Sequence, residues 1–261
     1  HYAQLASHAF WTTHTHQPSC CPKDSGRSNA NSKWNPASTI HMVNCYGRMG
    51  SVNGINSTLV AHCSDGSLPD PSTDGLIPLE AALGDLWYGE LFNAAELDLD
   101  DLSQIAWASY GCTPHTAVGR AALTVASAVA NYYLTGKIYI IRSVGVERYQ
   151  MRQPSGSAST RDHRIERVTN GDCRSALRSA VPRLPQTAPN YFIFCASVTD
   201  NWQRLEAGFC GSSALLQARS IDLQGFLSGG FSSAERSAII NALSIPANHY
   251  PMVIFSTGHG R

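Results

Sequence analysis

The sequence predicts an α+β domain over residues 76–261, preceded by an irregular extension over residues 1–75. The first observation is that 43% of the 261 residues are hydrophobic, which is enough to bury a full core. The second is that stretches with helical spacing alternate, after residue 76, with stretches rich in β-branched and aromatic residues. The third is a composition shift, since Ser, Asn, Thr, His, Pro and Gly dominate the extension.

Helices are expected where apolar residues recur at helical spacing and the flanking residues suit a helix end. Pro78 fits a first helical turn, and acidic residues open the stretch that begins at Asp98. Ser232 or Ser233 caps another helix, with Glu235 near its third position. The predicted helices cover residues 78–90, 98–110, 120–134, 172–180, 202–218 and 232–243.

Strands are expected where short apolar runs lie between turn residues. Residues 191–198 form a continuous apolar run, which is typical of a buried strand. Two runs around Ser143 and Val144 predict a hairpin. The predicted strands cover residues 137–142, 145–151, 163–168, 191–198, 221–227 and 252–257, with two more at 39–45 and 58–63 in the extension.

The charge pattern argues against nucleic acid as a partner, and the lengths of the apolar stretches argue against a membrane span. Lys and Arg number 19, Asp and Glu also number 19, and no basic run is interleaved with aromatic residues. Nucleic acid is therefore not an expected partner. No stretch reaches the roughly 20 apolar residues that a membrane-spanning helix requires, so no membrane span is expected either.

The eight cysteines contain no CxxC pair, which disfavours a zinc or iron–sulfur site. Together with the low charge and the sequon at Asn56, they favour an extracytoplasmic or secreted protein with some disulfides. The alternative is a cytosolic protein with free thiols. Cys45 and Cys63 bracket a hairpin-like stretch and are the first candidate pair. Histidines near the N-terminus more often form a solvated surface than a metal site, so no metal is predicted.

Several strings occur in the order and spacing of the nitroreductase family. Residues 99–111 resemble that family's Leu-rich helix ending in Trp-Ala-x-x-Gly, and residues 124–132 its segment containing Pro-Ser-Ala-Gly. Residues 146–149, 163–168 and 171–172 are similar to its central hairpin, and residues 204–208 and 228–231 to its Leu-Glu-Ala-Gly helix and Gly-Gly-Phe turn. The chain thus resembles the family over about residues 79–259, particularly the branch that includes the azoline-peptide dehydrogenases.

The resemblance implies a mixed, mainly antiparallel sheet flanked by helices, and commonly a homodimer with FMN at the subunit interface. It implies hydride transfer at flavin N5 with a nicotinamide or another small organic substrate. The glycines at 229 and 230 allow backbone N–H groups to approach a planar ring. The candidate cofactor contacts are Arg120, Ser127, Ala128, Gly229, Gly230, His259 and Arg261; no catalytic residue is assigned.

The sequence departs from the family where an Arg-rich motif usually contacts the phosphate. The aligned residues 86–92 contain no arginine and include Glu90, whose charge repels a phosphate. Arg120, His259 and Arg261 remain as possible substitutes. Two hypotheses stay open: an FMN-dependent oxidoreductase of the nitroreductase type, or a flavin-free, exported protein that keeps the scaffold for a structural or self-assembling role.

Overall fold

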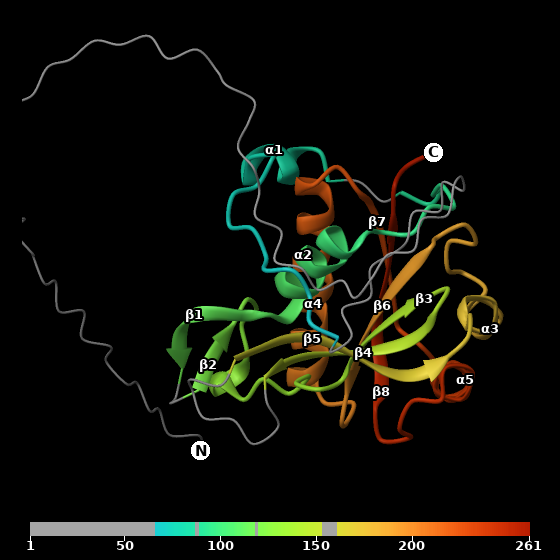
Figure 1. Ribbon diagram of the computed structural model, residues 1–261. Coiled ribbons are helices and arrows are strands. Elements are labelled where there is room, and N and C mark those ends of the chain that lie inside the picture. Colours follow the sequence, from blue (N-terminus) through green and yellow to red (C-terminus); the bar gives the residue numbers. More distant parts are fainter. Residues whose placement is uncertain (1–65, 87–88, 118–119, 153–160) are drawn as a thin grey trace, which may run out of the picture. The chain divides into compact units, whose positions relative to one another are not determined.

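The computed structural model describes residues 66–86, 89–117, 120–152 and 161–261 (Figure 1). The chain divides into two units, His1–Asn56 and Ser57–Arg261, and every described residue belongs to the second. The predicted strands at 39–45 and 58–63, the sequon at Asn56, and the pair Cys45 and Cys63 lie outside the described residues.

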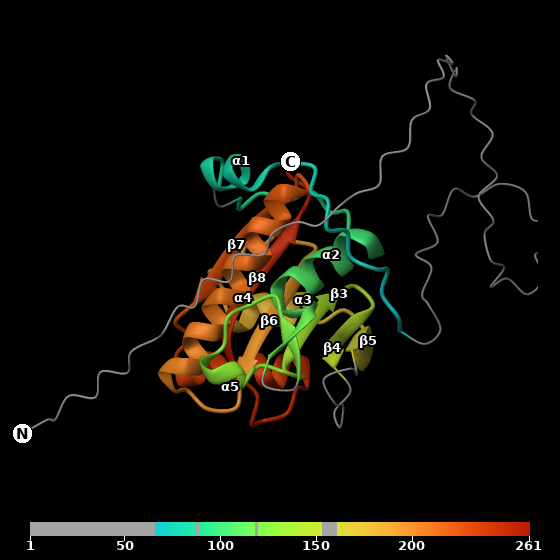
Figure 2. The same cartoon turned by 90° about the vertical axis from the view of Figure 1, so that its left-hand side faces the viewer.

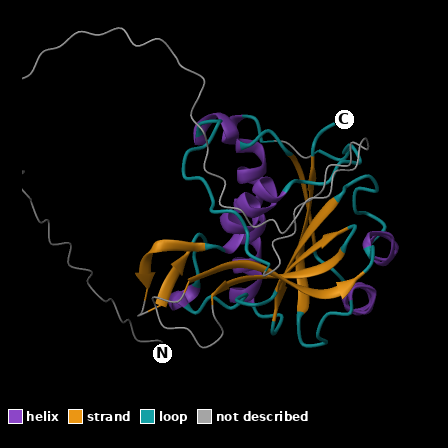
Figure 3. Cartoon of the chain, viewed as in Figure 1, coloured by secondary structure: helices purple, strands orange, loops and turns teal. Residues whose placement is uncertain are grey.

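A six-stranded sheet forms the centre of the described unit (Figure 3). Its strand order is β5-β4-β3-β6-β8-β7, and each neighbouring pair is antiparallel. This confirms the expected α+β class with a mainly antiparallel sheet, and β1 and β2 pair separately as a hairpin. The strands are β1 (Cys112–Ala117), β2 (Arg120–Leu123), β3 (Ile138–Arg142), β4 (Gly145–Arg152), β5 (Arg161–Asn170), β6 (Asn190–Ala196), β7 (Gln224–Gly229) and β8 (Tyr250–Gly258).

Helices cover both faces of the sheet, and each face buries its own core. Figures 1 and 2 show α4 running beside β7 and β8, with α2 against it, while α3 and α5 lie together on the other face. Alternate residues of β6 point to opposite faces, so Phe192 and Phe194 join one core while Tyr191 and Ile193 join the other. The helices are α1 (Leu79–Gly84), α2 (Leu99–Tyr110), α3 (Arg174–Ala180), α4 (Asn201–Ser220) and α5 (Ser233–Leu243), with a short 3-10 turn at Ala128–Ala130.

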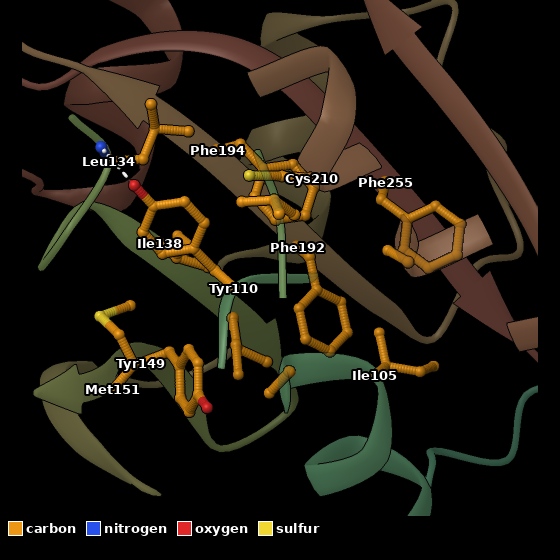
Figure 4. Close-up of a cluster of buried hydrophobic side chains, with 14 of the residues drawn as sticks. Ile105, Tyr110, Leu134, Ile138, Tyr149, Met151, Phe192, Phe194, Cys210 and Phe255 are labelled. Atoms are coloured by element: carbon orange, nitrogen blue, oxygen red, sulfur yellow. Dashed lines mark hydrogen bonds between the residues drawn. The ribbon is translucent and has the colours of Figure 1, made fainter. Parts of the chain in front are cut away.

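Figure 4 shows the core between the sheet and helices α2 and α4. Phe192, Phe194 and Phe255 from the sheet meet Ile105 of α2 and Cys210 of α4, and all are fully buried. The buried strand predicted over residues 191–198 is confirmed up to Ala196 by β6, in which every residue is buried; the strand ends there, and Val198 is 48% exposed. The described helices include none that is long and apolar enough to cross a bilayer.

The predicted helix over residues 120–134 is wrong. Residues 120–123 form strand β2, and the 3-10 turn that follows contains Val129 at φ 46°. The burial pattern gives the reason, because Ala121, Leu123 and Val125 are buried while the residues between them are more exposed. A period of two residues is a strand pattern, and the abundant alanines concealed it.

Other boundaries differ by smaller amounts. The first predicted helix, over residues 78–90, ends at Gly84, and residues 89–93 instead run in extended form, with Phe92 bridging to Gly260. Strand β7 begins at Gln224, three residues after the predicted start at Ile221, because the end of α4 turns through Ile221 and Asp222. The α5 cap is confirmed: Ser232 accepts from the Glu235 N–H, and the Glu235 carboxylate accepts from the Ser232 N–H.

Candidate functional site

The turn at Gly229 and Gly230 leaves the sheet at the end of β7, which is an edge strand. Both glycines are exposed, and Gly230 has φ 68°. A Cβ at Gly230 would meet no atom within 4 Å. Among the described residues, no group accepts a hydrogen bond from the Gly230 N–H. The turn therefore presents bare backbone to whatever lies beside it.

The surroundings of this turn are rigid. Arg183 donates to the Gly229 carbonyl at 3.2 Å, and its guanidinium carbon lies 5.0 Å from the centre of the Phe231 ring. Phe231 is only 3% exposed, so it anchors the turn to the core. Arg183 also pairs with Glu235, the residue of the α5 capping box. The glycines are thus exposed while the contacts of Arg183 and the buried Phe231 hold the turn in place.

Two hollows open at this end of the sheet and share Arg236 as a lining residue. The first, of about 450 Å³, adjoins the glycine turn and is lined by Arg204, Gly229, Gly230, Phe231, Arg236, Met252 and Val253. The second, of about 580 Å³, is lined by Val198, Thr199, Ser233, Arg236, Ser237, Ile240, Asn241, Ala247 and Tyr250. Arg204 comes from α4 and Arg236 from α5, so helices on opposite faces of the sheet each contribute an arginine to the first hollow.

Ser127 lies in a different environment, against the buried carboxylate of Glu206. Glu206 is 2% exposed and accepts hydrogen bonds from the Ser127 hydroxyl, the Tyr110 hydroxyl and the Leu134 N–H, the last at 3.2 Å. Burial, followed by the Glu206 charge, raises the pKa of Tyr110 well above its usual value, so the phenol remains a donor. Glu206 is therefore a buried carboxylate satisfied by three donors, which is a structural role.

This network holds the backbone of residues 127–134 in an uncommon path. The Ser127 hydroxyl also accepts from the Tyr132 N–H at 2.7 Å, and Tyr110 accepts from the Leu134 N–H at 3.0 Å (Figure 4). Val129, Ala130 and Tyr132 all have positive φ, which costs energy for residues with a Cβ. Ala128 lies in this same turn, and Val129 is 82% exposed at its tip.

Ser127 and the glycine turn are separated by helix α4. Glu206, which contacts Ser127, and Arg204, which lines the hollow at Gly229, are two residues apart on that helix. Two residues correspond to about 200° around a helix, so these side chains project from opposite sides. Within one chain, the candidate contacts Ser127 and Gly229 therefore do not face a common space.

His259 and Arg261 lie at the other end of β7. Gln224 pairs with Gly258 and Gly229 pairs with Val253, so the two ends of β7 are about 17 Å apart at the usual strand rise. The His259 carbonyl accepts from Asn93 at 3.0 Å, and the Arg261 N–H donates to Leu91 at 3.4 Å. The segments that aligned with the phosphate motif and with the C-terminal basic residues are thus brought together.

The charges at that end do not form an anion site. Arg219, a partly buried cation that lines the same hollow as His259, is paired with Asp85 and Asp222. The pKa of Asp101 is raised overall, mainly by burial and then by the charge of Asp98. The nearby His259 opposes part of this increase. Arg261 and Glu90 are both exposed. Arg120 begins β2, and its side chain lies outside the described part.

Comparison with known proteins supports the fold and nothing finer. No protein-family model matches the sequence, and no curated protein does. A Ralstonia eutropha JMP134 protein assigned as a nitroreductase superposes with a TM-score of 0.59 at 21% identity, covering 75% of this chain and 89% of its own. An Anabaena variabilis ATCC 29413 protein, also assigned as a nitroreductase, gives 0.51 at 15% identity, covering 70% of this chain and 38% of its own. The chain has a nitroreductase-like fold.

The fold family implies FMN. The two ends of β7 differ in how well their residues suit the parts of that cofactor. The open glycine turn, whose Gly230 N–H has no acceptor in the described part of the chain, fits the flat ring of a flavin. The region of His259 and Arg261 does not fit a dianionic phosphate, because Asp85 and Asp222 already neutralise Arg219 and the other arginine of this hollow, Arg261, is exposed to solvent. Among the described residues, no three His, Cys, Asp or Glu side chains gather as metal ligands do.

Two of the described cysteines are buried and two are partly exposed. Cys112, Cys173, Cys195 and Cys210 are not joined to one another by disulfides. Burial raises the pKa of Cys195 and Cys210, so these thiols remain protonated near neutral pH.

The residues that sequence reasoning missed are Arg204 and Arg236. Arg204 stood in the quoted Leu-Glu-Ala-Gly string without a role, and no motif marked Arg236.

Proposed function

We propose that the protein is an oxidoreductase of the nitroreductase type that holds the ring of FMN against the Gly229–Gly230 turn. The observation that carries the proposal is this turn: it is exposed, it is held by Arg183 and Phe231, and its Gly230 N–H has no acceptor among the described residues. FMN, when bound, would supply the atom that accepts and returns hydride. The protein's part is to position the ring and to leave one face open to a small organic or nicotinamide substrate.

We further propose that the site is completed by a second copy of the chain. Ser127 and Ala128 lie on the opposite side of α4 from the glycine turn, so both can line one ring only across a dimer interface. Helix α4 also exposes an apolar stripe: Trp202 is 60% exposed, Leu205 50% and Phe209 39%. These residues recur at helical spacing, as a contact between two helices requires.

A charge on this stripe tests the dimer. Leu205→Glu is expected to shift the protein from dimer to monomer in light scattering, because it places a carboxylate in the apolar contact. Leu83→Glu is the matched control, since Leu83 is 53% exposed on α1 and should leave the dimer intact. Wild-type protein that is monomeric at high concentration would contradict the proposal.

Flavin titration tests the ring site. Gly230→Asn should weaken FMN binding at least tenfold, because asparagine tolerates a positive φ while its side chain fills the space at the turn. Gly171→Asn is the control: Gly171 also has a positive φ and open space around it, on a distant turn after β5. Equal FMN affinity in the two variants would remove the ring site from the glycine turn.

A second function, a flavin-free exported scaffold, is favoured by one observation, the acidic residues that neutralise the phosphate end. In that case neither variant binds FMN, the wild-type protein does not bind it either, and the α4 stripe serves self-association alone.

The proposal of an oxidising compartment has its own test. Mass spectrometry of the alkylated native protein should find Cys45 and Cys63 protected, and eight modified thiols would contradict export.

A further inference from the structure

Arginines in the described part of the chain are mostly neutralised by carboxylates. Arg142 and Arg167 share Glu147, Arg174 contacts Glu96 and Asp172, and the others follow the same pattern. Among arginines whose side chains the structure describes, those outside these salt bridges are Arg178, Arg204, Arg236 and Arg261. Arg204 and Arg236 line the same hollow beside the glycine turn. We call the two hollows that share Arg236 the arginine cleft.

Arg236 is held in place without being neutralised. It is half-buried, and its Nε donates to the Pro251 carbonyl at 3.2 Å. Among the described groups, its remaining N–H groups have no partner. A guanidinium that is anchored at Nε and open at its two terminal nitrogens can offer a forked pair of donors to an oxyanion.

The carboxylates close in sequence to these arginines are engaged elsewhere. Glu206 is buried and accepts from Tyr110, Ser127 and Leu134. Glu235 pairs with Arg183 and closes the α5 capping box. Asp200 caps α4 and accepts from the Gln203 backbone and side chain at 2.8 and 3.1 Å. The cleft therefore keeps an excess of positive charge in a chain whose formal net charge is zero.

The rest of the lining is largely apolar. Ile240, Tyr250, Met252 and Val253 supply hydrocarbon and aromatic surface, while Ser233, Ser237 and Asn241 supply polar groups along one helix. A fixed cation at the junction of two mainly apolar hollows is suited to a ligand with a charged head and an apolar body.

We infer that the arginine cleft binds a small amphipathic anion, a molecule with one carboxylate or phosphate head held by Arg236 and Arg204 and an apolar body along Ile240 and Tyr250. The cleft opens beside the glycine turn, so the inference deepens the proposed function by naming a substrate class. The anion contacts themselves involve protein atoms only, and they can be tested on flavin-free protein.

The test is calorimetric titration of the full chain with octanoate, octyl phosphate and 1-octanol, which share a tail and differ in the head. Octanoate and octyl phosphate should bind at least tenfold more tightly than octanol, and added salt should lower the affinity of both anions. Comparing the two anions shows whether carboxylate or phosphate is the preferred head. Octanol binding as tightly as the two anions would overturn the inference.

Matched variants assign the binding to the cleft. Arg236→Gln and Arg204→Gln should each weaken octanoate at least tenfold, and Arg236→Lys should restore part of the loss, since it keeps the charge without the fork. Arg178→Gln is the control, because Arg178 is also outside the salt bridges but contacts Tyr191 away from the cleft. Arg204 is exposed, so its variant keeps the test valid if the Arg236 variants fail to fold. Unchanged octanoate affinity in Arg204→Gln would overturn the inference, whether or not flavin binds.

Discussion

At one end of β7 the chain leaves the sheet through two exposed glycines, whereas at the other, closed end the Gln224 side chain fills the space beside Gly89 and Gly260. At the open end Arg236 makes no salt bridge with a described residue. At the closed end Arg219 is paired twice, and the arginine outside the described salt bridges is the exposed Arg261. The difference shows how one strand can serve two purposes. Its closed end stabilises the fold, and its open end is left for a ligand.

The largest expected effect is at the closed end. Phe92 is 1% exposed, packs near Gly258 and bridges to Gly260. Phe92→Ala should lower the free energy of unfolding by about 3–5 kcal/mol, because a large buried ring is replaced by a cavity. Urea unfolding measures this loss. A loss under about 1 kcal/mol, or an altered octanoate affinity in the folded variant, would break the contrast between the ends.

A pH effect is expected near the open end, where His249 precedes Tyr250 of the cleft. The Tyr139 hydroxyl lies 2.6 Å from His249 Nδ1, and burial, aided by Lys137 and Arg148, lowers the pKa of His249 to about 4. The unfolded histidine takes up a proton below about 6.5. The neutral form thus stabilises the fold fully above that pH, and this contribution is lost as the pH falls towards 4.

Because His249 is only half-buried, the full shift must be discounted, which leaves roughly 1–2 kcal/mol. Urea unfolding at pH 7.5 and at pH 4.5 should show this loss, and His249→Gln should reduce the difference between the two conditions. An identical pH dependence in the variant would assign the effect to other groups.

A smaller effect is expected from the cap that fixes the glycine turn. Ser232→Ala removes the acceptor for the Glu235 N–H and should cost about 1 kcal/mol of stability. The same variant should weaken octanoate only slightly, since Arg236 keeps its bond to Pro251. Ser179→Ala, which removes a similar exposed hydroxyl from α3 away from the cleft, is the control for a general effect of removing a serine.

Elements with a local signal were predictable from the sequence. The α5 boundary followed from Ser232 and Glu235, and β6 followed from its unbroken apolar run. The segment after Gly111 was not predictable, because its path depends on Glu206, which lies far along the chain and holds Ser127 and Leu134. The local spacing of apolar residues does not depend on a carboxylate that is distant in the sequence, so it cannot predict these contacts.

The candidate site was predictable only in part. The glycines at 229 and 230 are visible as a turn in the sequence, and their exposure at the sheet edge agrees with that expectation. The arginines are different: Arg204 and Arg219 lie on the same helix, yet only Arg219 meets carboxylates, those of Asp85 and Asp222. Which cation is free depends on tertiary pairing, and sequence spacing does not encode it.

The most direct test of the central claim, that the open end of β7 holds a flavin by its ring and that the closed end does not hold its phosphate, is the ratio of riboflavin to FMN affinity. Titration followed by flavin fluorescence should give dissociation constants within about threefold of each other, because a phosphate without a positive site contributes little. An FMN affinity a hundredfold above that of riboflavin would contradict the assignment of the phosphate end. The absence of binding by either flavin would contradict the ring site at Gly229 and Gly230.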